Sequence, residues 1–365
     1  MDKVQNNSAP IHIKRYGNED LRLVKEFYER SYQGDLNRKI VAFRWMAENN
    51  PFIDQGNNYV LVLKDGKVVG YCGSMPMRFY LNGQPFMAIF GQEILVDPSV
   101  RKQGLATTLL REIKYSNCFW ISLWFNENVL SILQKEGKLN IGYFRPLKKI
   151  FKIESLFRVE LKERIKNRII ENILLKLARR YHRLRHEKKR EKEQYDVEGV
   201  ETFDSRYDEF FLKVAGKFKL ISDRTSQTLN WKYIDIPHRQ FRAFCVLKNR
   251  NLVGYIILGI EHQEDNITKG IIADLLIAPE EVEGLKSLLR ISDRFFIENG
   301  VDFSVCHVSF PIFRSVMRKQ GYYEGKQVKC DCLLIYNEKL SPNPEIVKDI
   351  KKWYFTYGDS DYTMW

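Results

Sequence analysis

The stretch that decides the fold is residues 93–107, which read Glu93-Ile94-Leu95-Val96-Asp97-Pro98-Ser99-Val100-Arg101-Lys102-Gln103-Gly104-Leu105-Ala106-Thr107. The apolar run ends at Val96, and Pro98 cannot continue a strand interior. Beyond Gly104, apolar residues recur with the spacing of an amphipathic helix. The stretch therefore predicts a strand, a tight turn and the first turn of a helix.

The turn has the properties of an anion site. A helix N-terminus exposes unpaired N–H groups and the positive end of the helix dipole, which together suit a diphosphate. Gly104 and Ala106 have little or no side chain, so the backbone can approach phosphates closely, and Arg101 and Lys102 add positive charge. The candidate binding residues of this turn are Arg101, Lys102, Gln103, Gly104, Leu105, Ala106 and Thr107.

This turn resembles the R/Q-x-x-G-x-G/A signature of the GNAT acetyltransferases, and G-x-x-x-x-G-K-[ST] and G-x-G-x-x-G are both absent from the sequence. The context of about 130 residues adds to the resemblance, with an upstream hairpin at Gly70-Tyr71 and Asn126 downstream. The resemblance implies an acetyl-CoA site in which the strand ending at Val96 splays from the strand at 119–124. Pantetheine would then bind the strand backbone at Ile94, Leu95 and Val96, with Asn126 nearby.

The resemblance also implies a base and an acid. Glu93 stands where family members often carry a glutamate that takes the proton from the acceptor amine. The alternative for Glu93 is a salt-bridged or solvent-facing carboxylate. Where many members place a tyrosine that protonates the leaving thiolate, this sequence has Leu133, so Tyr143 is the substitute candidate.

The sequence contains an internal repeat. Trp45, Gly70, Pro98 and Gly142 are echoed in the same order at offsets of 186, 184, 181 and 179 residues. The landmarks fall on a helix, a hairpin, a strand end and a later turn. Their constant order predicts two copies of one α/β unit.

The expected architecture is therefore an α/β fold with two tandem GNAT-like mixed sheets, flanked by helices and joined by a long basic amphipathic helical segment. Residues 1–150 form the unit with the acetyl-CoA loop, and residues 151–195 form the basic connector. Residues 196–340 form a degenerate GNAT-like unit, and residues 341–365 an aromatic tail expected to pack onto the body.

The second copy departs from the first at the phosphate turn. Glu280, Glu281 and Glu283 follow Pro279, where the first copy has basic residues. Carboxylates repel a diphosphate, so this copy is not expected to hold CoA in the same way. We expect it to shape the acceptor pocket, with Asp274 as a candidate acceptor contact or else a solvent-facing carboxylate.

The connector carries much of the chain's positive charge. Residues 158–193 contain 14 Lys or Arg and 6 Glu, and Leu161, Ile165, Ile169, Ile173 and Leu177 recur every four residues. Three interpretations stay open. The segment is a helix packed on the two units, a surface for anionic lipid or a lipid-linked substrate, or an RNA-binding arm.

Composition sets the class of protein and its partners. The 365-residue chain has a net charge of +13, which favours an anionic partner. No signal peptide and no membrane-length apolar run is present, so we expect a cytoplasmic protein, peripheral to the inner face of the membrane if the connector binds lipid. The six cysteines form no C-x-x-C pair, so we expect reduced thiols and no metal.

The sequence thus predicts an acyl-CoA-dependent N-acyltransferase that transfers an acetyl group to a primary amine. The acceptor is expected to be anionic, such as an amino sugar or a precursor of bacterial cell-surface polysaccharide. Two alternatives stay open: a Fem-like ligase that uses aminoacyl-tRNA, and a non-catalytic module that binds membrane or, less favoured, nucleic acid.

Overall fold

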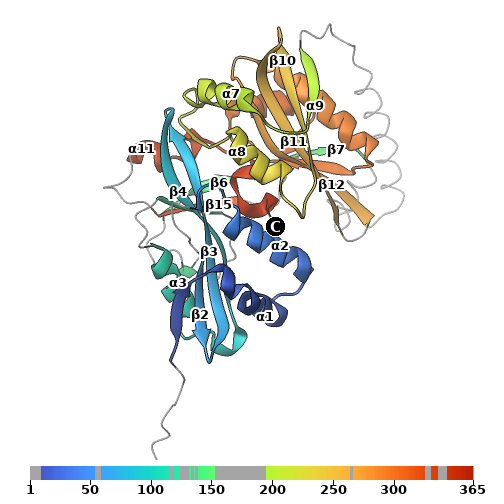
Figure 1. Cartoon of the computed structure of the whole chain (residues 1–365). Coiled ribbons are helices and arrows are strands. Elements are labelled where there is room, and N and C mark those ends of the chain that lie inside the picture. The colour runs from blue at the N-terminus through green and yellow to red at the C-terminus, as the bar shows by residue number, and fades with distance from the viewer. Residues whose placement is uncertain are drawn as a thin grey trace, which may run out of the picture.

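A computed structural model describes residues 10–53, 59–114, 119–123, 131–132, 135, 139–152, 195–263, 266–324, 330–335 and 343–364. Two β-sheets, each covered by helices, make up the described part of the molecule (Figure 1). Among these residues no helix is both long and apolar enough to cross a membrane.

The first sheet has the strand order β1-β2-β3-β4-β5-β15-β6, and β4 and β5 form a parallel pair within it. Its strands are β1 (His12–Arg15), β2 (Val60–Lys64), β3 (Lys67–Leu81), β4 (Gln84–Val96), β5 (Phe119–Leu123), β6 (Leu139–Phe144) and β15 (Cys330–Ile335). Two short strands, β9 (Leu220–Ser222) and β16 (Trp353–Tyr354), extend it beside the far half of β3.

Alternating side chains give this sheet two buried faces. Tyr59 and Leu61 join the core beneath α1 (Leu21–Ser31) and α2 (Leu36–Glu48), whereas Val60 and Val62 join the core beneath α3 (Leu105–Lys114). Apolar side chains on both faces of the sheet need a covering layer, so this period of two predicts helices on both sides.

The second sheet has the order β8-β10-β11-β12-β13-β7-β14. Its strands are β7 (Leu147–Ile150), β8 (Asp196–Val200), β10 (Phe241–Lys248), β11 (Asn251–Gln263), β12 (Ile267–Ile277), β13 (Phe303–Cys306) and β14 (Tyr323–Glu324). The helices packed on this sheet among the described residues are α7 (Ser205–Ala215), α8 (Ser226–Leu229), α9 (Val282–Glu298) and α10 (Pro311–Lys319). Helix α11 (Pro344–Val347) packs on the core of the first sheet. A π-helical turn over Asn230–Ile234 continues α8.

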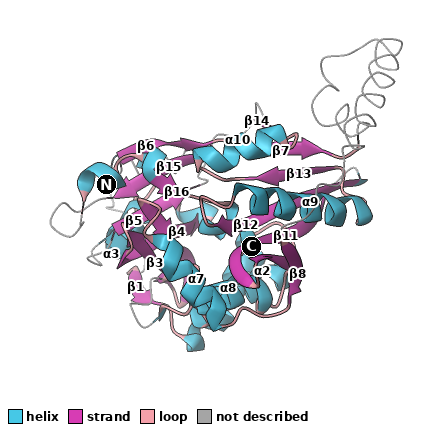
Figure 2. Ribbon diagram, turned by 90° about the horizontal axis from the view of Figure 1, so that it is seen from above, coloured by secondary structure: helices cyan, strands magenta, loops and turns pink. Residues whose placement is uncertain are grey.

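The two sheets exchange a strand. β7 precedes the connector in the chain, yet it pairs with β13 and β14 of the second sheet (Figure 2). In return, β15 from the C-terminal half lies between β5 and β6 of the first sheet. With this exchange the seven strands of each order correspond position by position, and in each sheet the fourth and fifth strands are parallel.

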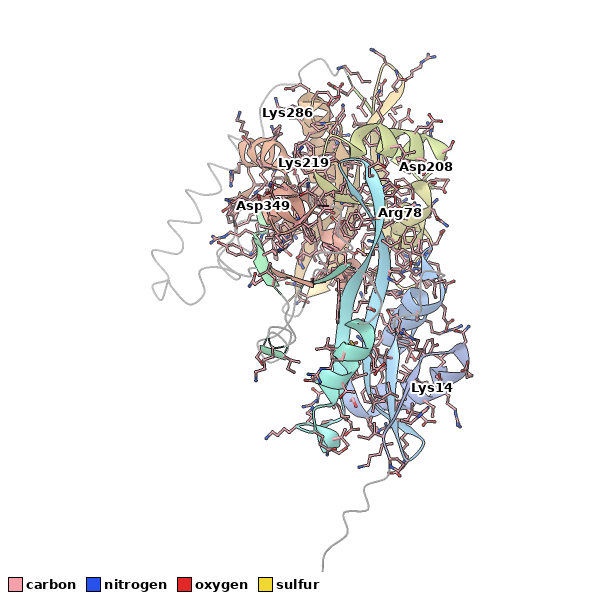
Figure 3. The ribbon with its side chains drawn as sticks, turned by 90° about the vertical axis from the view of Figure 1, so that its left-hand side faces the viewer. Lys14, Arg78, Asp208, Lys219, Lys286 and Asp349 are labelled. Carbon is pink, nitrogen blue, oxygen red and sulfur yellow. The ribbon has the colours of Figure 1, made fainter. Side chains whose placement is uncertain are left out.

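The tip of the β3–β4 hairpin also reaches the second half. Arg78 on β3 forms an ion pair with Asp223 at 3.0 Å, and Asn82 donates its backbone N–H to Lys219 at 2.9 Å. Figure 3 shows this long hairpin rising from the first sheet to a position beside Asp208 on α7. The halves are therefore joined by strands as well as by the connector.

The expectation of two mixed sheets flanked by helices is confirmed. The matching strand orders support the duplication, which stays a prediction, as do the domain boundaries. The basic segment falls within residues 153–194, outside the described residues, so its helical interpretation also stays a prediction.

Candidate functional site

The end of β4 leaves its partner β5. The parallel ladder runs from the pair Ala88–Phe119 to the pair Gly91–Ser122. β5 is described as far as Leu123, and β4 continues to Val96. Among the described residues, no strand pairs with the edge of Gln92–Val96 that follows the β5 ladder, so this edge is the candidate backbone for binding a ligand.

A β-bulge marks the point where the strands part. Cys72 of β3 pairs with Ile94, and Ser74 pairs with Gly91, so Gly73 alone faces the two residues Gln92 and Glu93. An extra residue bends a strand and changes the direction of its side chains. The bulge therefore explains why β4 turns away from β5 at this position.

The predicted phosphate turn follows β4 directly. Asp97 accepts hydrogen bonds from the backbone N–H and the hydroxyl of Ser99, at 2.9 and 2.7 Å. Arg101 Nε donates to the carbonyl of Val96 at 3.0 Å, and α3 begins at Leu105. These bonds hold the chain reversal between the strand and the helix.

The turn is open at its centre. Gly104 has φ +79°, and an added Cβ would meet no atom of the described residues within 4 Å. Arg101, Lys102, Gln103 and Gly104 are all exposed, and Leu105 is buried beneath them. The space at the N-terminus of α3 therefore has room for an anion, with basic side chains at its rim.

Glu93, one of the two bulge residues, lies in a cluster of polar side chains. Its Oε2 is 2.7 Å from Nζ of Lys39 and accepts a hydrogen bond from the hydroxyl of Tyr71 at 2.6 Å. The Tyr28 hydroxyl lies 3.5 Å from the same oxygen and donates to Tyr71 at 2.8 Å. Glu93 is thus ion-paired, which was the alternative to the free base.

Two buried phenols hold this carboxylate in place. Burial, followed by the negative charge of Glu93, raises the pKa of both Tyr28 and Tyr71 well above the ordinary value. Both hydroxyls therefore stay protonated and can donate. Beside them, the Tyr59 hydroxyl bonds to Oε1 of Gln92, whose Nε2 lies 2.8 Å from Sδ of Met46.

The structure does not bring Tyr143 to Glu93. Tyr143 lies on β6, which is separated from β4 by β5 and β15, and it is 40% exposed. Its hydroxyl accepts a hydrogen bond from Arg145 at 3.1 Å. Asn126 and Leu133 lie outside the described residues, whereas Ile94, Leu95 and Val96 lie half-buried on the free end of β4.

The corresponding turn of the second half is occupied by carboxylates. Glu281 precedes α9 and accepts hydrogen bonds from Tyr195 at 2.6 Å and from Lys248 at 3.0 Å. The hydrogen bond from Tyr195 lowers the pKa of Glu281, and the one from Lys217 lowers the pKa of Glu280. Both side chains are therefore ionised where a phosphate would lie.

The tail closes the second half further. β12 and β13 pair only as far as Ile272–Cys306, so they part as β4 and β5 do. Residues of the tail fill this opening: the Tyr354 hydroxyl donates to the carbonyl of Leu275, and Thr356 forms a bridge to Val308. The sequence predicts only the carboxylates as an obstacle to CoA in this half, because no local signal indicates where a distant tail lies.

Asp274 belongs to this buried tail contact, so the interpretation of a solvent-facing carboxylate is wrong, and the acceptor contact stays a prediction. Asp274 is 3% exposed and pairs with Arg224 at 3.3 Å. Arg224 also binds Asp359 of the tail at 2.8 Å, and Thr356 donates to Asp274 at 2.9 Å. The expected packing of the tail on the body is confirmed by the burial of Trp353, Phe355 and Met364.

Comparison with known proteins identifies the first half. Residues 12–114 match the family model described as acetyltransferase (GNAT) domain. This stretch is therefore a GNAT acetyltransferase domain, the domain type of N-acyltransferases that use acetyl-CoA as cosubstrate. The curated proteins gave no match to the chain.

Solved structures share the fold across most of the chain. A GCN5-related N-acetyltransferase from Anabaena variabilis has a TM-score of 0.60 and 13% identity, covering 89% of this chain and 72% of that one. Saccharomyces cerevisiae N-myristoyltransferase with bound myristoyl-CoA has a TM-score of 0.57 and 12% identity, covering 91% and 85%. A GCN5-related N-acetyltransferase from Kribbella flavida has a TM-score of 0.56 and 11% identity, covering 90% and 71%. At these identities the likeness concerns the fold.

Proposed function

We propose that this protein is an acyl-CoA-dependent N-acyltransferase whose first half binds acetyl-CoA and transfers the acetyl group to a primary amine. The observation that carries the proposal is the continuity between the free end of β4 and the open turn at Gly104. A strand edge that lacks its partner and a helix N-terminus with room for an anion lie within one stretch of chain. The match of residues 12–114 to the GNAT domain supports it.

The residues present fit the cosubstrate. The N-terminus of α3, with Arg101 and Lys102, would hold the diphosphate, and the backbone of Ile94, Leu95 and Val96 would bond to the pantetheine arm. Acetyl-CoA supplies the activated acyl group as a thioester. A backbone N–H at the free edge of β4 would polarise its carbonyl and stabilise the oxyanion formed on attack.

Glu93 is proposed to receive the proton that the attacking amine loses. Its Oε2 is occupied by Lys39 and Tyr71, so the proton would reach it through Oε1 or a water molecule. Tyr143 is not close to this carboxylate along the sheet, which leaves the thiolate to depart without it. The acceptor is proposed to be an anionic amine such as an amino sugar, in keeping with the net charge of +13.

The cosubstrate site is tested by Gly104→Glu. A carboxylate at the N-terminus of α3 would occupy the anion space and repel the diphosphate, so we expect the affinity for CoA to fall by more than about 100-fold. Isothermal titration should give one CoA site per chain in the unmodified protein, because the second turn is occupied by carboxylates.

Gly66→Glu is the matched control. Gly66 also has positive φ, at +73°, and an added Cβ there meets no described atom within 4 Å, but it lies on the turn between β2 and β3. It should keep CoA affinity within about twofold of the unmodified protein. Equal losses in the two variants would show that the N-terminus of α3 does not hold the diphosphate. Two equal CoA sites would instead contradict the prediction that the second half does not bind CoA.

A further inference from the structure

A large open pocket lies in the second half, away from the turn at Gly104. Its volume is about 1170 Å³, and its walls come from β10, the end of β11, the C-terminal part of α9 and Arg38 of α2. Drug-sized ligands occupy pockets of about 300–1,000 Å³, so this one has room for a larger molecule. The mechanism proposed above does not use it.

Its walls are polar and basic. The lining contains three arginines, Arg38, Arg239 and Arg242, and Lys269 lies behind it. Two carboxylates, Glu201 and Glu261, stand against these four cations. Glu261 is shared between Arg239 at 2.5 Å and Lys269 at 3.1 Å, so one carboxylate lies between two positive groups. This arrangement leaves a positive potential in the pocket. The amides Gln240, Gln263 and Asn299 add hydrogen-bonding groups suited to hydroxyls.

His238 also lines this pocket. Its Nε2 lies 2.6 Å from the carbonyl oxygen of Met364, and because a carbonyl only accepts, Nε2 carries the proton. Nδ1 is then a lone pair, buried and without a hydrogen-bond partner among the described residues. Burial, then the charges of Arg38 and Arg239, lower the pKa of His238, so the ring is neutral near pH 7.

The pocket shares two elements with the candidate reaction centre. Arg38 borders the pocket, and the next residue on α2, Lys39, holds Glu93. The tail forms the second connection, because Arg239 bonds to the carbonyl of Tyr362 at 3.0 Å. Figure 1 shows the C-terminal end beside α2, between the two halves.

The tail also lies close to the polar cluster around Gln92 and Glu93. Burial raises the pKa of Tyr59, and the charge of nearby Asp361 raises it further. Tyr59 is the residue that bonds to Gln92 at the bulge. Residues 361–364 therefore lie between the pocket and the end of β4 that would hold the thioester.

We propose that this pocket binds the acyl acceptor, and that the acceptor is a phosphorylated, hydroxyl-rich amine. This inference rests on the proposed function. Arg38 and Arg242, which are exposed, would take the phosphate, which planar guanidinium groups bind with two hydrogen bonds. The amides would take hydroxyl groups, and the amine would point past α2 toward Glu93.

Binding measurements test the site without needing turnover. Isothermal titration compares glucosamine 6-phosphate with glucosamine, and uridine diphosphate with uridine, so that sugar phosphates and nucleotides are distinguished. We expect at least one phosphorylated probe to bind tenfold or more tightly than its neutral partner. Arg242→Glu should remove that preference, since Arg242 is exposed on β10 and its charge faces the pocket wall.

Arg250→Glu is the matched control. Arg250 is also exposed, but it lies in the turn at the other end of β10, roughly 25 Å along the strand pair. It should keep the preference for phosphate, and both variants should bind CoA as the unmodified protein does. Equal loss in the two variants, or no phosphate preference for either probe, would overturn the acceptor site. Failure of the unmodified protein to bind CoA would instead contradict the proposed function.

Discussion

Glu93 owes its surroundings to one extra residue in β4. Without the bulge opposite Gly73, the side chains of Gln92 and Glu93 would alternate strictly across the sheet. With it, both reach polar partners: Glu93 contacts Lys39 and Tyr28 of the helical layer, and Gln92 contacts Tyr59, which directly precedes β2. A carboxylate fixed in this way cannot swing freely, so a catalytic role depends on the amine being brought to it.

Glu93→Gln should separate a catalytic role from a structural one. Glutamine keeps the size of the side chain and an acceptor for Tyr71, but it cannot receive a proton at pH 7. If Glu93 is the base, kcat should fall about 10²–10⁴-fold. KM for acetyl-CoA should change by less than about threefold, because the cosubstrate binds elsewhere. Steady-state kinetics with a primary-amine acceptor gives both values.

The control for this variant is Glu48→Gln. Glu48 is also a carboxylate that accepts a hydrogen bond from a buried tyrosine, Tyr16 at 2.8 Å, and pairs with a cation, Arg44 at 3.3 Å. It lies at the end of α2, away from the bulge. Its variant should lose no more than about 1 kcal/mol of stability and keep kcat. An unchanged kcat in Glu93→Gln would exclude the base.

At the scale of helices and strands, the sequence predicts elements whose signals are local, but it does not predict which distant strands pair. Residues 93–107 specify their own strand, turn and helix, because proline, glycine and apolar spacing act within a few residues. The bulge at Gln92–Glu93 leaves no such mark. Strand β15 lies more than 180 residues after its neighbours β5 and β6, and its place between them follows from packing alone.

The same limit applies to charged residues of the tail. Sequence composition indicated that an aromatic tail would be buried, yet it gave no sign that Asp359 pairs with Arg224 or that both lie 2–3% exposed. A buried ion pair needs partners from several elements, here β12, the residues after β9, and the tail. The pocket beside His238 was missed for the same reason.

The buried cluster makes the tail a structural element, which Arg224→Met should reveal. Arg224 bonds to Asp274, Asp359, Thr356 and Ser222, so its loss leaves two carboxylates buried without their cation. Breaking such a pair costs about 3–5 kcal/mol. Urea unfolding should show that loss. Arg206→Ala, which breaks an exposed pair with Asp204, should cost less than about 1 kcal/mol. Equal costs would mean that the cluster does not hold the tail.

For the molecule as a whole, the two halves share a strand order but differ in what occupies the opening between the fourth and fifth strands. In the first half the opening between β4 and β5 meets an exposed basic turn. In the second, the tail fills the opening between β12 and β13, and ionised carboxylates cover the start of α9. The tail thus closes one half and continues toward the bulge of the other, which would make a single reaction centre served by both halves.

Strand exchange makes each half depend on the other. The first sheet needs β15 between β5 and β6, and the second needs β7 between β13 and β14. A chain ending at residue 152 would leave β5 and β6 without the strand that joins them. Unpaired strand edges in the middle of a sheet expose backbone groups and promote aggregation. We therefore expect residues 1–152 or 195–365, produced alone, to be insoluble or unfolded by circular dichroism.

Cutting the intact protein should have the opposite result. A protease site inserted within residues 153–194 and cleaved after folding should give two fragments that elute together in size-exclusion chromatography, because exchanged strands and the Arg78–Asp223 pair still join them. The fragments should separate only in denaturant and regain CoA binding only when refolded together. Free separation of the cut fragments under native conditions, or a stable and soluble half produced alone, would show that each sheet completes itself without the exchanged strand.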